Sequence, residues 1–89
     1  MSTIRLPAPL AELAGRSEIA VDAANVLAAL RSLNALHPGL FDRICTEQNE
    51  PRKHVLIYVG DTDIRELNGT RTELKGHETI YVLPSMTGG

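Results

Sequence analysis

The last two residues of the chain, Gly88 and Gly89, are those whose type and position could best support chemistry. Residues 79–89 carry no charged side chain, so the only ionised group in this stretch is the main-chain carboxylate of Gly89. Because glycine lacks Cβ, two glycines can enter a narrow channel with backbone angles that other residues avoid. Such a carboxylate could attack the α-phosphate of ATP held by another protein, and sulfur or an amine could then open the acyl-adenylate. The alternative is an ordinary disordered chain end.

The other reactive side chains have simpler explanations. Cys45 lies on the apolar side of a short helical turn, and a buried free cysteine is usually an inert small hydrophobe. His37 stands before Pro38, where we expect a helix to end, and Asp61 and Asp63 suit a turn without a metal. The sequence therefore predicts no metal site, no bound cofactor and no catalytic machinery, so we do not expect an enzyme.

Composition narrows the classes of protein further. With 89 residues, 43% of them apolar, the chain is long enough for one aliphatic core. The net charge of −2 argues against nucleic acid as a partner, since phosphate binding needs clustered basic residues. The apolar runs are too short to span a membrane, and Pro7 and Pro9 interrupt any early signal segment. A single cysteine suits a reducing compartment, so we expect a soluble cytoplasmic protein.

The elements that would present the terminus follow from hydrophobic periodicity and from turn residues. Short alternating or apolar runs predict strands, and one amphipathic stretch behind Asn25, a good N-cap, predicts the main helix. Strands are expected at 3–6, 17–21, 55–59, 64–65 and 79–83, and helical segments at 9–14, 26–36 and 40–45. Pro84 should end the last strand, which divides the chain into a domain at 1–84 and a flexible tail at 85–89. The pattern predicts an α+β layer of helix on mixed sheet, and a right-handed crossover would set the strand at 55–59 beside the first pair.

Two of these strands should each have an outward face that is unusually apolar. If Val55, Ile57, Val59, Ile80 and Val82 face the helix, alternation points four other side chains away from it: Leu56, Tyr58, Tyr81 and Leu83. Were the two strands neighbours, these four would form an exposed apolar patch beside the tail, and such a patch usually marks a partner site. The alternatives are that the polar loop at 46–53 covers it or that it joins two copies of the chain.

The order of motifs resembles the ubiquitin-like (β-grasp) sulfur carriers of the ThiS/MoaD type, most closely those of cysteine biosynthesis. The matching stretches are Ile4-Arg5-Leu6-Pro7, Pro38-Gly39-Leu40, His54-Val55-Leu56-Ile57-Tyr58-Val59, Asp63-Ile64-Arg65, Ile80-Tyr81-Val82-Leu83-Pro84 and Gly88-Gly89. The resemblance implies a β-grasp fold with four to five strands in the order 2-1-5-3-4 and one main helix on one face. The chain departs from the family at Gly76-His77-Glu78, where relatives commonly have Asp-Gly-Asp, which leaves the turn before the last strand undetermined.

The resemblance also implies a function. An E1-like adenylyltransferase, related to ubiquitin-activating enzymes, would dock on the outward patch and use ATP to activate Gly89, with Gly88 threading its channel. Sulfur would then be installed as a thiocarboxylate and consumed by a client enzyme of cysteine, molybdopterin, thiamine or secondary metabolism. Leu83-Pro84 would start the tail, and Pro84 and Met86 would join the partner contacts. Some relatives also need a processing metalloprotease. The alternatives are a protein modifier joined to lysines through Gly89 and a plain binding module.

Overall fold

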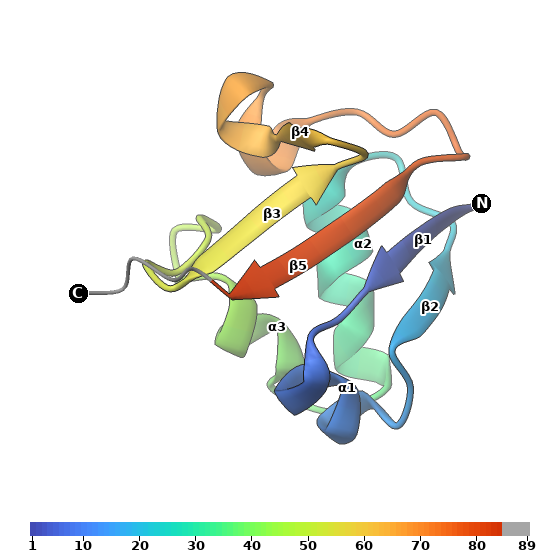
Figure 1. Cartoon of the computed structure of the whole chain (residues 1–89), viewed down its shortest axis with the longest axis vertical. Helices are drawn as coiled ribbons and strands as arrows, with labels where there is room; N and C mark the ends of the chain where they lie inside the picture. Colours follow the sequence, from blue (N-terminus) through green and yellow to red (C-terminus); the bar gives the residue numbers. More distant parts are fainter. Residues whose placement is uncertain (85–89) are drawn as a thin grey trace.

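A five-stranded mixed sheet forms the centre of the protein, which was analysed as a computed structural model (Figure 1). The structure describes residues 1–84, so the predicted tail at 85–89, with Met86, Gly88 and Gly89, lies outside the described residues. The strands are β1 (Ser2–Arg5), β2 (Glu18–Val21), β3 (Val55–Val59), β4 (Thr62–Asp63) and β5 (Thr79–Pro84).

The strands are arranged in the order β2-β1-β5-β3-β4, as the resemblance to the β-grasp carriers implies. β1 pairs with β2 antiparallel and with β5 parallel, and β5 pairs antiparallel with β3. The simpler expectation that β3 would lie beside the first strand pair is wrong. The last strand, β5, lies between β1 and β3. No local pattern in the sequence predicts this long-range pairing.

The helical segments lie around the side of the sheet that carries the core. They are α1 (Ala8–Ala14), α2 (Val26–Arg31), η1 (Ser32–Ala35), α3 (Leu40–Ile44), η2 (Ile64–Glu66) and η3 (Gly69–Arg71). α2 begins where predicted, because the Asn25 side chain accepts a hydrogen bond from the backbone N–H of Ala28 at 2.8 Å. The predicted helix at 26–36 tightens into the 3₁₀ segment η1 after Arg31, and the hydroxyl of Ser32 donates to the carbonyl of Ala29. Leu36, expected on the buried face, is 39% exposed for this reason.

The predicted short strand at 64–65 is wrong, and the strand lies just before it. β4 comprises Thr62 and Asp63, and the chain then turns into η2. The carboxylate of Asp63 accepts a hydrogen bond from the backbone N–H of Arg65 at 2.9 Å and so caps the turn. A capping side chain competes with extended structure, which ends the strand one residue before Ile64.

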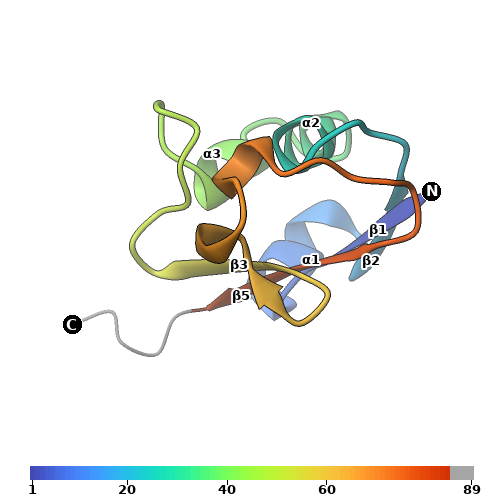
Figure 2. The same ribbon diagram turned by 90° about the horizontal axis from the view of Figure 1, so that it is seen from above.

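One face of the sheet carries the core and the other stays open. Figure 1 looks onto the sheet with α2 behind it, and Figure 2 shows α2 and α3 on the same side of the strands. The core is aliphatic and joins α2 to the inward residues of the central strands, among them Ile4, Leu30, Ile57, Ile80 and Val82. Within residues 1–84, no helix is long and apolar enough to cross a membrane.

Candidate functional site

The four predicted outward residues meet on the open face of the sheet. In the register of β3 and β5, Leu56 lies opposite Leu83 and Tyr58 lies opposite Tyr81, so the four form two adjacent cross-strand pairs. Leu83 is 40% exposed and the other three are half-buried, whereas Ile57, Ile80 and Val82 between them are buried. The predicted faces of both strands are confirmed. We call Leu56, Tyr58, Tyr81 and Leu83 the outer patch, and its role in partner binding stays a prediction.

Arginines border the outer patch on both sides. Arg5 of β1 lies beside Tyr81 in the parallel register, and its guanidinium is 3.5 Å from the carboxylate of Glu18 on β2. On the opposite side, Arg65 pairs at 2.7 Å with Asp63, which lies opposite Tyr58 on β4. The hydrogen bonds from Arg65 lower the pKa of Asp63, and that carboxylate keeps Arg65 at this edge. The patch therefore has an apolar centre with an arginine–carboxylate ion pair on either side.

The turn before β5 fixes where the strand begins. Gly76 has a φ of +108°, a left-handed angle that favours glycine, so the displaced turn glycine still makes a turn. The carboxylate of Glu78 accepts hydrogen bonds from the backbone N–H groups of Lys75, Gly76 and His77, and from the hydroxyl of Ser2. These backbone donors lower the pKa of Glu78 to about 2. The strand then starts at Thr79, as predicted. It ends at Pro84, which lies opposite Val55 at the other end of the sheet.

Two surface depressions flank Pro84, the last described residue before the tail. One lies between the loop at 50–53 and η2, and Lys53, Leu56, Arg65 and Pro84 are among the residues that line it. The other lies between α1, α3 and the end of β5, and its lining includes Leu10, Arg43, His54 and Leu83. The loop at 46–53 therefore borders the outer patch on one side rather than covering it, since Leu83 stays exposed.

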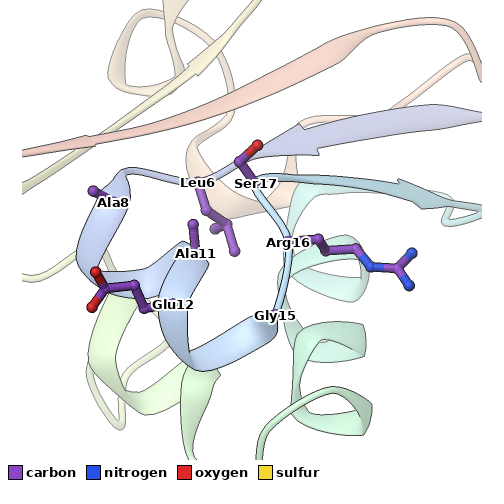
Figure 3. A pocket seen from close by; sticks show the side chains of 7 residues that line it. All are labelled: Leu6, Ala8, Ala11, Glu12, Gly15, Arg16 and Ser17. Atoms are coloured by element: carbon purple, nitrogen blue, oxygen red, sulfur yellow. The ribbon is translucent and has the colours of Figure 1, made fainter.

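A third depression lies beside α1 and the start of β2, away from the outer patch (Figure 3). Small and apolar side chains line it, with Glu12 and Arg16 at its edge pointing away from one another. Among the described residues that line it, Ser17 supplies the only hydroxyl, and there is no histidine or cysteine.

Cys45 is buried completely in the core, as its position in the sequence predicts. Burial, with a smaller contribution from Glu50, raises the pKa of its thiol to about 11, which disfavours the reactive thiolate. In the part of the chain that the structure describes, no three His, Cys, Asp or Glu side chains gather as metal ligands.

Sequence reasoning missed the charged residues around this surface. Arg43, Lys53 and Arg65 come from α3, a loop and η2, and only tertiary structure brings them to the two depressions beside Pro84. No spacing in the sequence connects them. The alternation along β1 indicates that Arg5 points away from the core. No local pattern indicates that β1 pairs in parallel with β5, which places Arg5 beside Tyr81.

Comparisons with known proteins agree with this geometry. The ThiS family model matches residues 4–89. The sulfur carrier protein CysO of Mycobacterium tuberculosis is 26% identical over 77 residues, which span 84% of this chain and 83% of that protein. A chain in the crystal structure of the Amycolatopsis orientalis BexX/CysO complex superposes with a TM-score of 0.88 at 27% identity, over 100% of both chains. Small archaeal modifier protein 1 of Methanosarcina acetivorans gives a TM-score of 0.83 at 30% identity, over 99% of this chain and 95% of that one. The fold is that of the β-grasp proteins.

Proposed function

Because the chain belongs to the ThiS family, we propose that it is a sulfur carrier whose terminal carboxylate becomes a thiocarboxylate. An oxygen of the Gly89 carboxylate attacks the α-phosphate of ATP in an activating enzyme, and pyrophosphate leaves. Sulfide then attacks the acyl carbon, AMP leaves, and a thiocarboxylate remains. The observation that carries the proposal is that the family match extends to Gly89. The central strand β5 ends at Pro84, so the match includes the residues that follow the sheet.

In this proposal the chain is a co-substrate, and its partners hold the ATP and perform the bond changes. The outer patch supports docking of the E1-like activating enzyme, because two aromatic and two leucine side chains lie together on an open face of the sheet. The strand that carries Tyr81 and Leu83 leads directly into Pro84, so a partner on the patch lies beside the start of the tail. A client enzyme would consume the sulfur from the same tail.

The test is intact mass spectrometry after incubation with the activating enzyme, ATP and sulfide. We expect the mass to rise by the exchange of one oxygen for sulfur, and the gain to map to the C-terminal peptide. A variant that lacks Gly89 is the control and should show no gain. If the full chain stays unmodified while a related carrier is thiolated under the same conditions, the proposal fails.

A second candidate function is that of a protein modifier joined to lysines through Gly89. The likeness to the small archaeal modifier protein supports it, because that comparison has the highest sequence identity of those described above. Lysine-linked adducts in cell lysate that disappear when Gly89 is deleted would favour this function. If deletion of Gly88 and Gly89 leaves the function of the chain intact, both proposals fail, and a plain binding module remains.

A further inference from the structure

The two depressions that flank Pro84 are rich in positive charge, although the chain as a whole has a net charge of −2. We call their four strongly basic residues the basic cluster: Arg43, Arg52, Lys53 and Arg65. Among residues 1–84, only two carboxylates line the same depressions, Glu50 and Asp63, and Asp63 already pairs with Arg65. Positive charge therefore accumulates at the end of the sheet where the tail begins.

Three of the four cations of this cluster are exposed, whereas Arg52 is half-buried and its guanidinium donates to the backbone carbonyl of Asp42. Arg43 and Lys53 are exposed, and within residues 1–84 neither forms an ion pair. The side chain of Arg65 is 73% exposed even though its guanidinium touches Asp63. The four residues belong to α3, the loop that follows it and η2, so three separate segments supply the charge.

We infer that the basic cluster binds carboxylates on the activating enzyme, so that this partner presents acidic side chains around an apolar contact for the outer patch. The inference rests on the proposed function. The cluster is continuous with the patch, because Leu56 lines the same depression as Lys53 and Arg65, and Leu83 lines the same one as Arg43. An apolar centre with charge at its rim is the usual anatomy of a protein–protein interface.

Nucleic acid fits the same charges less well. Phosphate backbones are bound by extended basic surfaces, whereas the net charge of this chain is negative and the cluster surrounds leucine and proline side chains. Exposed charges at the rim of a protein interface mainly raise the rate of association, and salt screens their effect. The cluster should therefore make association with the acidic partner fast and dependent on salt.

The experiment compares Lys53→Glu with Arg16→Glu, which changes the net charge equally but lies in the exposed link between α1 and β2, away from the outer patch. The probe is the activating enzyme with ATP, and kcat/KM for adenylation of the full chain is measured at low and high salt. We expect Lys53→Glu to lower kcat/KM about fivefold at low salt, mostly through KM, while Arg16→Glu stays within about twofold of wild type. High salt should largely remove the difference. Arg43→Glu, on a different element, should behave like Lys53→Glu, and thermal melts check that all three variants fold.

Several results would overturn the inference. Equal effects of the Lys53 and Arg16 variants would show that only net charge matters. A defect that persists at high salt would point to a structural role. Binding of a labelled single-stranded DNA that is lost in Lys53→Glu, with adenylation unchanged, would assign the cluster to nucleic acid. If wild type is adenylated and the variants match it, only this inference fails, whereas a wild type that is never adenylated would overturn the proposed function and the inference together.

Discussion

Tyr58 of β3 and Tyr81 of β5 lie directly opposite one another on the open face of the sheet. Cross-strand pairs of this kind contribute about 0.2–1 kcal/mol to stability, a small fraction of what a buried side chain contributes. The two tyrosines can therefore be changed without unfolding the protein, which allows docking and folding to be tested separately.

Tyr81→Asp should weaken docking of the activating enzyme and leave the fold intact. The substitution places a negative charge in the apolar centre of the outer patch, and we expect KM for adenylation to rise about tenfold or more. Thr79→Asp is the matched control, because Thr79 lies on the same face of the same strand but outside the patch. Thermal melts should show both variants a few degrees below wild type, since aspartate is a poor strand residue. A melt of Tyr81→Asp far below that of Thr79→Asp would mean that Tyr81 is part of the core.

The alternation along β5 predicts a large loss of stability when Ile80 is truncated to alanine and a small loss when Leu83 is truncated. Ile80 is buried completely, so Ile80→Ala should lower the free energy of unfolding by about 2–5 kcal/mol. Leu83 is 40% exposed, and Leu83→Ala should cost less than about 1 kcal/mol. Chemical denaturation measures both. In the docking assay the order should reverse, with Leu83→Ala the more harmful variant at temperatures where both are folded.

Most of the fold could be predicted where a local pattern decides it. Strong β-formers at 55–59 and 79–83 placed the central strands correctly, and the cap at Asn25 placed the start of the main helix. The faces of β3 and β5 followed from period-two alternation. The outer patch could be predicted from these elements, but its contiguity depended on the strand order that the family resemblance implied.

What could not be predicted depends on side chains that act across turns or across the fold. The capping hydrogen bond of Asp63 ends β4 at Asp63, so the strand lies two residues earlier than the predicted 64–65. The 3₁₀ ending of the main helix left Leu36 exposed despite its helical spacing. The basic cluster arises only when α3 and η2 are brought to the same end of the sheet, so no window of sequence contains it.

Cys45 should be inert in the folded chain. Its side chain is fully buried and the pKa of its thiol is raised to about 11, so little thiolate is present at neutral pH. Iodoacetamide at pH 8 should leave the native protein unmodified and alkylate it once denaturant is added, as intact mass would show. Rapid labelling of the native protein would contradict this, and it would require any sulfur gained in the carrier assay to be mapped against Cys45 as well as Gly89.

Glu78 should make stability depend on pH in acid. Its pKa is lowered from 4.5 to about 2 in the folded chain, chiefly by the backbone N–H of Lys75, whereas the unfolded chain titrates near the ordinary value. The folded state thus gains stability from the ionised carboxylate above pH 4.5, and this contribution is lost as the pH falls from 4.5 through 2. Glu78→Gln should melt several degrees below wild type at pH 7, and the two melting temperatures should converge near pH 2.

Glu12→Gln is the control for this prediction, because Glu12 is exposed on α1 and accepts no hydrogen bond from the backbone among the described residues. Its melting temperature should follow that of wild type across the whole pH range. A constant gap between Glu78→Gln and wild type down to pH 2 would show that the glutamine disturbs packing rather than charge. The turn held by Glu78 sets the start of β5, the strand that carries Tyr81. Glu78→Gln should therefore also raise KM for adenylation at neutral pH.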